Sequence, residues 1–236
     1  MAPTIVLVHG AFAESSSWDR VIDALLNAGH RVIAAPNPLR SVEADAESVS
    51  DLVRSLTGPV LLVGHSYGCV VTTNIAADAG DLVGLVYIAG FAPDSGESVQ
   101  SIVERFPGST LGQTLRTVPR RDGTTDATID PEHFHAQFAA DVPATEAARM
   151  AVTQRPITLE ALAGATGPDP LWKRVPSWFL LAGEDRNVPP DAIRFMAERA
   201  GARRLVEIAG ASHAIAVSQP GPTAELILEA AQPPAA

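Results

Sequence analysis

One serine in this chain stands in a setting that could make it a nucleophile. A short apolar run at residues 60–63 stops at a G-x-S-x-G pattern, residues 64–68, and a helix-like segment rich in small residues follows. A serine on so tight a strand-to-helix turn projects its Oγ out of the fold, with a helix N-terminus behind it. A side chain at Gly64 or Gly68 would collide with the neighbouring strand or helix. The pattern predicts that Ser66 is a nucleophile, although so short a motif also occurs by chance.

Two further residues could activate this serine. A serine hydroxyl attacks a carbonyl only when a base removes its proton, and the base must be oriented by an acid. In one chain order for such a triad, Ser precedes Asp or Glu, which precedes His, and each follows the carboxyl end of a strand. Ser66 follows one expected strand, Asp185 follows a later one, and His213 follows the last. The order predicts that His213 shuttles the proton and that Asp185 orients His213.

Two other carboxylates compete with Asp185 for the role of the acid. Glu184 is adjacent to it, but neighbouring residues on a turn point in different directions. Asp94 follows the strand after the serine, which is an alternative place from which a carboxylate could reach the base. Asp185 is the favoured candidate, and both alternatives stay open at this point.

Of the six histidines, only His213 lies after the final expected strand. His9 and His65 lie inside glycine motifs at strand ends, where a histidine commonly supports the turn. The H-x-H spacing of His133 and His135 is a weak metal signal, and no cysteine or cluster of carboxylates completes a site there. We therefore expect no metal centre.

Acyl transfer also needs two N–H donors that already point at the developing oxyanion. We expect one donor from the backbone of Tyr67, directly after the nucleophile and at the helix N-terminus. The other should come from the loop after the first strand, at Ala11. The side chains of Phe12 and Tyr67 could wall an acyl pocket or simply pack in the core.

The elements that must position these residues alternate between strands and helices, which predicts a parallel sheet covered on both faces. Continuous apolar strands are what such a doubly covered sheet requires. The expected strands are residues 5–8, 32–35, 60–63, 82–89, 177–182 and 205–208. The expected helices run from Ser17, as the N-cap, to Gly29, and then over residues 49–58, 68–79, about 193–200 and about 226–231.

The alternation breaks at residues 94–172, which contain prolines, a turn signal at 121–123 and two or three short helical stretches. A segment so long is rarely structureless inside a compact domain. We interpret it as a lid inserted into a core formed by residues 1–93 and 173–236, whose tail from Pro233 should fray. Apolar lid residues could face a pocket or form the lid's own small core: Phe106, Phe134, Phe138, Leu159 and Leu162. Phe134 and Phe138 are our candidates for substrate contact.

The composition of the 236 residues, with 46% hydrophobic and 19% charged, fits one globular domain with a substantial core. A formal net charge of −10 and the lack of a basic stripe argue against a nucleic-acid partner. Cys69 is the only cysteine, so we expect a small buried packing residue rather than a disulfide. Without a signal-peptide pattern or an apolar run of about 20 residues, we expect a cytoplasmic protein with no membrane partner.

With these residues assembled, the chain resembles the α/β-hydrolase superfamily and, within it, the methylesterase and hydroxynitrile lyase group. The resemblance covers nearly all of the chain outside the lid. It rests on Leu7-Val8-His9-Gly10-Ala11 with Ser17-Trp18, Leu62-Val63-Gly64-His65-Ser66, Ala92-Pro93-Asp94-Ser95, Gly183-Glu184-Asp185 with Pro189, and Ser212-His213 through Ser218-Gln219-Pro220. The resemblance implies an α/β-hydrolase fold with a mostly parallel sheet of about six strands and an inserted lid. It also implies Ser66 as nucleophile, His213 as base, Asp185 as acid, and no metal or organic cofactor.

Two departures from that group bear on the reaction. The hydroxynitrile lyases carry a threonine where this chain has Gly10, and a lysine directly after the base, where it has Ala214. Without those polar groups cyanide has no obvious cationic partner, which disfavours lyase chemistry. The turn also has Tyr67 and Cys69 where many relatives have a smaller or aliphatic residue and glycine, so the acyl pocket should differ in shape.

The sequence therefore favours a serine hydrolase that cleaves a small carboxylic ester or lactone through an acyl-enzyme. Two alternatives stay open. One is a ligand-binding or signalling module that retains the triad with negligible turnover. The other is a cofactor-free lyase or oxygenase on the same scaffold.

Overall fold

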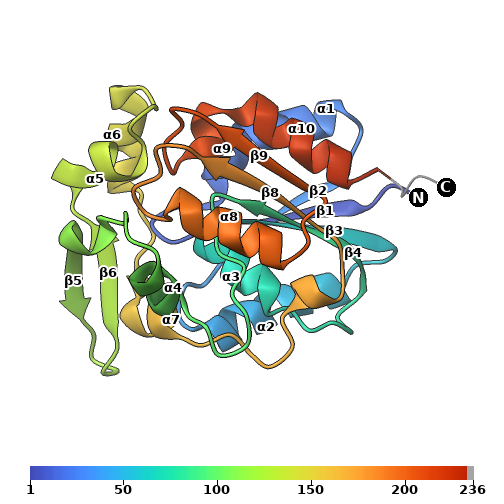
Figure 1. Cartoon of the computed structure of the whole chain (residues 1–236), viewed down its shortest axis with the longest axis horizontal. Helices are drawn as coiled ribbons and strands as arrows, with labels where there is room; N and C mark the ends of the chain where they lie inside the picture. Colours follow the sequence, from blue (N-terminus) through green and yellow to red (C-terminus); the bar gives the residue numbers. More distant parts are fainter. Residues whose placement is uncertain (233–236) are drawn as a thin grey trace.

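Six parallel strands form the central sheet of this computed structural model, which describes residues 1–232 (Figure 1). The strand order is β2-β1-β3-β4-β8-β9, and every neighbouring pair is parallel. The strands are β1 (Thr4–Val8), β2 (Val32–Ala35), β3 (Pro59–His65), β4 (Asp81–Ile88), β8 (Ser177–Ala182) and β9 (Arg204–Ile208). The predicted parallel sheet of about six strands is confirmed. The tail from Pro233, for which we expected fraying, lies outside the described residues.

Both faces of the sheet are buried because successive strand residues point to opposite sides. In β1, Ile5 and Leu7 join one buried cluster, whereas Val6 and Val8 join the other. The first cluster is closed by α1 (Asp19–Asn27) and α10 (Pro220–Ala230), with the short α9 (Ile215–Ser218) beside them. The second cluster is closed by α2 (Val42–Arg54), α3 (Tyr67–Thr73) and α8 (Pro190–Arg199). Helices on both sides hold the sheet as a rigid platform for the loops at its carboxyl edge.

Several helix ends differ from the sequence-based prediction. Ser17 does not cap α1: its hydroxyl donates to the Glu14 carbonyl at 2.7 Å and closes a 3₁₀ turn, Ser15–Trp18, ahead of the helix. Helix α3 ends at Thr73 rather than near residue 79. The side-chain amide of Asn74 donates to the Val70 carbonyl at 2.8 Å and so competes with the backbone hydrogen bonds that would continue the helix. Local side-chain hydrogen bonds, which periodicity does not register, set both ends.

Helices α2 and α10 begin earlier than predicted. Ser41 caps α2, and its side chain accepts a hydrogen bond from the Ala44 amide at 3.1 Å. Helix α10 begins at Pro220, a residue whose fixed φ suits the first helical turn. Both start signals stand in the sequence ahead of the apolar positions from which we predicted these helices.

Residues 94–172, which we call the insert, leave the core after β4 and return to it before β8 (Figure 1). Figure 1 shows the insert beside the carboxyl ends of the core strands. It carries a three-stranded antiparallel sheet in the order β5-β6-β7, which the sequence did not predict. Its elements are α4 (Val99–Arg105), a 3₁₀ turn (Leu111–Gln113), β5 (Leu115–Pro119), β6 (Thr125–Ile129), α5 (Pro131–Phe138), α6 (Ala144–Val152), β7 (Ile157–Thr158), α7 (Leu159–Ala163) and a second 3₁₀ turn (Leu171–Lys173).

Hydrogen bonds join the insert to the core at several places, including its two ends and strand β7. At its ends, the indole Nε1 of Trp172 donates to the Pro93 carbonyl at 2.9 Å. On β7, the amide of Thr158 donates to the Leu39 carbonyl at 3.1 Å, and its hydroxyl donates to the Arg40 carbonyl at 2.6 Å. The insert is thereby held across the carboxyl edge of the sheet.

The described residues contain neither a helix that could span a membrane nor a cluster of metal-ligating side chains. None of the helices within residues 1–232 has both the length and the apolar composition that a bilayer crossing requires. In the same part of the chain, no three His, Cys, Asp or Glu side chains gather closely enough to hold a metal ion.

Candidate active site

Ser66 lies on the turn between β3 and α3 in a strained backbone conformation. Its φ is 53° and its ψ is −121°, a region that residues other than glycine seldom occupy and that costs about 1–3 kcal/mol. The surrounding structure holds it there, since the Ser66 amide donates to the Ile88 carbonyl of β4 at 3.1 Å. The residue is 7% exposed and lines a cavity. The predicted strand–serine–helix turn is therefore present.

The two glycines of the turn are required by close approach of neighbouring backbone. A Cβ at Gly64 would lie 2.6 Å from the amide nitrogen of Cys69 on α3. A Cβ at Gly68 would lie 2.8 Å from the carbonyl oxygen of His9, beside β1. Both distances are shorter than real Cβ contacts, which confirms that side chains here would collide with a helix and a strand.

His213 and Asp185 form a buried hydrogen-bonded pair. The Nδ1 of His213 lies 2.7 Å from Oδ2 of Asp185, and the two side chains are 1% and 0% exposed. Because an ionised carboxylate only accepts hydrogen bonds, the proton lies on Nδ1 and Nε2 is left as the basic nitrogen. The other oxygen of Asp185 accepts from the amides of Asn187 and Val188, at 2.7 and 2.9 Å. This local turn fixes the carboxylate that orients the imidazole.

His65 and the insert hold the loop that carries His213. The Nε2 of His65 donates to the His213 carbonyl at 2.9 Å. Burial, together with the neighbouring His213, lowers the pKa of His65 to about 3, so its ring is neutral. From the insert, the Phe138 carbonyl accepts from the Ala214 amide at 2.9 Å, and the Phe138 ring packs edge-on against the His213 ring at 4.8 Å.

His9 plays a similar part in the loop after β1. Its Nε2 accepts from the Asn37 amide at 3.1 Å, so Nδ1 carries the proton and donates to the Gly10 carbonyl at 2.9 Å. Burial lowers the pKa of His9 and favours this neutral form. The side-chain amide of Asn37 also donates to the His9 carbonyl at 2.9 Å. These bonds position the following residue, Ala11, at the cavity wall.

Ser66 and His213 open onto the same apolar cavity of about 400 Å³. The core supplies its floor and the insert supplies aliphatic side chains to its walls. Among the described residues, none of those that line it carries a charged Asp, Glu, Lys or Arg side chain. The lining residues are Ala11, Phe12, Ser66, Tyr67, Phe91, Val99, Gln100, Val103, Ser109, Leu111, Gly112, Leu115, Leu159, Leu162, Ala163, Asn187, Val188 and His213.

A model of the alpha/beta hydrolase family matches residues 5–226, most of the chain. The chain belongs to the alpha/beta hydrolase family. The chain is 26% identical over 237 residues to an alpha-hydroxynitrile lyase of Arabidopsis thaliana, covering 91% of this chain and 92% of that protein. It is 27% identical over 250 residues to methylesterase 7 of Arabidopsis thaliana, covering 96% and 95%. Its fold matches the crystal structure of polyneuridine aldehyde esterase with a TM-score of 0.84 at 19% identity, covering 98% of this chain and all (100%) of that one.

The two carboxylates that compete with Asp185 in the sequence lie away from His213. Glu184 is exposed. The carboxylate of Asp94 forms an ion pair with Lys173, and its side chain is 31% exposed. Burial opposes ionisation of Asp94, but Lys173, the Ser95 amide and Arg199 together outweigh it and hold the pKa of Asp94 below its usual value. Of the three candidate carboxylates, the structure brings only Asp185 to His213.

Only some of the residues proposed for substrate contact line the cavity. Phe12 lines the cavity, and so do Leu159 and Leu162 of the insert. Phe134 and Phe138 do not: they are 0% and 1% exposed and stack on each other at 5.0 Å. The prediction that these two residues contact substrate was wrong, because neither lines the cavity. Phe138 packs against the ring of His213, and Phe134 packs against Phe138. Phe106 likewise turns away and packs on Phe195 at 5.3 Å.

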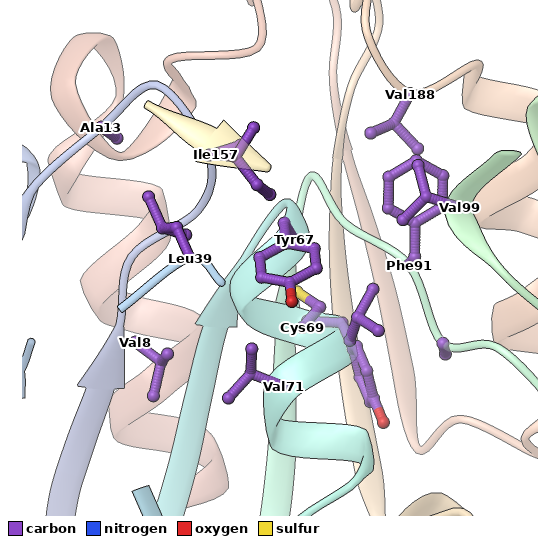
Figure 2. Packing of buried hydrophobic residues seen from close by; sticks show 14 of the residues in the cluster. Val8, Ala13, Leu39, Tyr67, Cys69, Val71, Phe91, Val99, Ile157 and Val188 are labelled. Carbon is purple, nitrogen blue, oxygen red and sulfur yellow. The ribbon is translucent and has the colours of Figure 1, made fainter. Parts of the chain in front are cut away.

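Tyr67 both lines the cavity and packs in the core, two alternatives that the sequence left open. Its side chain lines the cavity and also packs in the core, where Figure 2 draws it with Leu39 and Ile157 on one side and Phe91 on the other. Its hydroxyl donates to Oδ2 of Asp45 at 2.8 Å. The tyrosine is thus anchored by its polar end and presents its ring to the cavity.

Sequence reasoning missed Asp45, which is 0% exposed on α2. Its carboxylate also accepts from the Arg40 amide, at 3.0 and 3.1 Å. Burial raises the pKa of Asp45 because it penalises the charge, although these hydrogen bonds oppose the rise. A signal was present, since Asp45 lies on the same helical face as Val42 and Val49, and an acid on an apolar stripe is unusual.

The remaining polar candidates behave as packing or surface groups. Cys69 is fully buried, and burial raises the pKa of its thiol, which keeps it protonated. The side chain of His133 is 59% exposed, and the Nε2 of His135 donates to the Val142 carbonyl at 2.9 Å.

Proposed function

We propose that this protein is a serine hydrolase that cleaves a small carboxylic ester or lactone through an acyl-enzyme intermediate. One observation carries the proposal. His213, whose Nδ1 is hydrogen-bonded to Asp185, lines the same apolar cavity as the strained Ser66. A nucleophile, a base and an orienting acid on three separate strand ends make a constellation suited to acyl transfer.

In the proposed reaction, Ser66 Oγ attacks the carbonyl carbon while His213 Nε2 takes its proton. The oxyanion then accepts hydrogen bonds from the amides of Tyr67, the first residue of α3, and of Ala11. His213 passes the proton to the leaving alcohol, and the acyl group stays on Ser66. Water, deprotonated by His213, releases the acid. Asp185 stabilises the imidazolium form of His213 in both halves of the reaction.

The cavity and the comparisons both support an ester as the substrate. The lining lacks charged side chains among the described residues. A neutral ester can therefore enter the cavity without the cost of removing a charged group from water. The anionic acid formed by hydrolysis would find no cation there, which favours its release. Relatives of this chain include a methylesterase over nearly the whole length, and polyneuridine aldehyde esterase shares its fold.

The cyanohydrin-cleaving alternative is less well supported, although a hydroxynitrile lyase is among the relatives. A Cβ at Gly10, where those lyases carry threonine, would lie 2.7 Å from the Cβ of Ser66. The turn in this protein therefore leaves no room for that side chain. Ala214 supplies no cation next to His213, and none lines the cavity within the described residues.

The first prediction concerns the nucleophile. Ser66→Ala should lower kcat/KM for p-nitrophenyl butyrate by about 10³-fold or more, because the covalent step is lost. A fluorophosphonate probe should label the native protein and not this variant. The measurements are initial rates and intact-protein mass spectrometry, with Ser55→Ala, an exposed serine on the surface, as control.

Each outcome of this experiment separates the candidate functions. Unchanged ester turnover in Ser66→Ala would contradict the proposal. Stoichiometric labelling of Ser66 with a burst but no steady turnover would favour the ligand-binding module. Release of cyanide from a cyanohydrin, with no ester hydrolysis, would favour the lyase.

A further inference from the structure

Next to the reaction cavity lies a second hollow, a cleft of about 270 Å³ between the loop after β1 and the insert. Residues from that loop, from α6 and from α9 line it. They are Phe12, Ala13, Glu14, Ser16, Ser17, Asp19, Glu146, Arg149, Met150, Thr153 and Val217. Among the described residues, Phe12 is the one that lines both this cleft and the reaction cavity. The ring of Phe12 thus stands where the two hollows adjoin.

We propose that Phe12 sets the upper limit on the length of the ester chain that the reaction cavity accepts, by closing that cavity off from the cleft. This inference rests on the proposed function. Phe12 directly follows Ala11, the expected oxyanion donor, so a chain bound at Ser66 that extends past this loop meets the phenyl ring. A chain that fits in front of the ring is accepted, and a longer one must displace it.

The backbone of Phe12 favours a fixed position for this ring. Its φ is 59°, a left-handed conformation that is rare for a bulky residue. The residue is nevertheless held there and is only 4% exposed. A residue with so constrained a backbone and so little exposure acts as a partition between the two hollows rather than as a mobile surface side chain.

The two hollows differ in charge, which gives the partition a chemical signature. The reaction cavity has no charged lining residue within the described part of the chain, whereas three carboxylates and one guanidinium line the cleft. These are Glu14, Asp19, Glu146 and Arg149, and Glu146 also pairs with Arg20 at 2.9 Å. A chain that passes the position of Phe12 would place its far end beside excess negative charge. A cationic end should then be preferred to an anionic one.

The test compares chain-length profiles of Phe12→Ala, Phe12→Leu and the native protein. Two probe series are used, p-nitrophenyl alkanoates and alkyl acetates, each from 2 to 12 carbons, because the chain near Phe12 belongs either to the acyl or to the alcohol side. Leu162→Ala is the matched control: it enlarges the same cavity from the insert side, away from the cleft. A second set, aryl esters of long ω-amino acids and of long ω-carboxy acids, reports the charge at the far end.

In Phe12→Ala, the ratio of kcat/KM for the 12-carbon to the 4-carbon ester should rise at least 10-fold in one series. Phe12→Leu should give a smaller rise in the same series, and it carries the test if the alanine variant fails to fold. The ω-ammonium ester should be preferred over the ω-carboxylate ester several-fold more strongly than in the native protein. Adding Glu14→Gln should reduce that preference.

The proposal is overturned if neither series changes its length profile in the Phe12 variants while hydrolysis still depends on Ser66. It is also overturned if Leu162→Ala produces the same rise and the same charge preference, since a general loosening would then explain both. Loss of the Ser66 dependence itself would instead contradict the proposed function. Ser66→Ala is therefore combined with each variant as a background.

Discussion

In the proposed reaction, Asp185 acts through His213, to whose ring it is joined by a single hydrogen bond. Replacing Asp185 by Asn should lower kcat about 10³–10⁴-fold and change KM little, because the amide can donate to Nδ1 and select the wrong tautomer. Steady-state kinetics on p-nitrophenyl butyrate measure this. The exposed neighbour gives the control, since Glu184→Gln should behave as the native protein. A loss in the Asn variant of less than about tenfold would remove Asp185 from the proposed triad.

Residue types and order were enough to select the candidate reacting groups, because the proposed chemistry requires specific side chains. Ser66, Asp185 and His213 each follow a strand in the predicted order, and the structure brings Asp185 and His213 into contact. The directions in which side chains of the insert point could not be predicted in the same way. Phe134 and Phe138 lie on one short helix of the insert, and no periodicity in eight residues shows which way that helix turns. The structure directs both rings behind His213 rather than into the cavity.

At the scale of elements, a chain of polar contacts connects the core helices to the insert. Tyr67 on α3 donates to Asp45 on α2, which accepts from the amide of Arg40. The guanidinium of Arg40 then pairs with Asp126 on β6 at 2.6 Å, and Asp126 also pairs with Arg120 at 2.7 Å. The wall of the cavity at Tyr67 is therefore joined to the insert sheet by consecutive hydrogen bonds.

The Tyr67–Asp45 contact should be strongly coupled. Tyr67→Phe should lower the free energy of unfolding by about 1–3 kcal/mol, because it removes a donor from a buried carboxylate. Asp45→Asn should also destabilise, since its amide group would face the N–H of Arg40. The double variant should lose less stability than the sum of the two single losses, by about 1 kcal/mol or more. Urea unfolding of the four proteins measures this, and strict additivity would show that the contact contributes nothing.

The core elements were predictable for a physical reason that the insert does not share. A strand buried on both faces must be apolar throughout, and β8 was predicted with its observed bounds from that run alone. Strands β5 and β6 are short, and most of β5 is exposed, so they leave no such run. The turn signal at residues 121–123 does mark the tip of their hairpin, where the Arg120 amide donates to Thr124 at 2.9 Å. The sequence therefore predicted the turn but not the two strands that it joins, and the insert sheet was not predicted.

For the molecule as a whole, the buried histidines should govern stability in mild acid. The pKa of His65 is about 3 in the folded protein against 6.5 for an ordinary histidine, so only the unfolded chain takes up this proton between those values. The free energy of unfolding should therefore fall by a few kcal/mol as the pH drops from about 6.5 towards 3. His9, whose pKa is also lowered by burial, acts in the same direction. Asp45 acts in the opposite direction, because its raised pKa favours the folded state once it is protonated.

His65→Gln tests this, because its amide can still donate to the His213 carbonyl but does not titrate. The variant should show a shallower loss of stability between pH 6.5 and 4 in urea titrations at fixed ionic strength. His133→Gln, on the exposed face of the insert, serves as control and should keep the native slope. Identical slopes in the native protein and the His65 variant would mean that this ring does not resist protonation.

The bond between Trp172 and the Pro93 carbonyl brings together the two ends of the 94–172 segment. To the core, that segment is a closed loop between β4 and β8, which pair with each other in the sheet. Its internal length and architecture are therefore free to change without moving either strand. An exchanged segment would bring its own cavity walls to this edge of the sheet. It would also need to replace the contacts that the insert makes with residues 39–40 and with the loop of His213. Any change of substrate range by exchange of this segment is therefore limited by those contacts rather than by the pairing of β4 with β8.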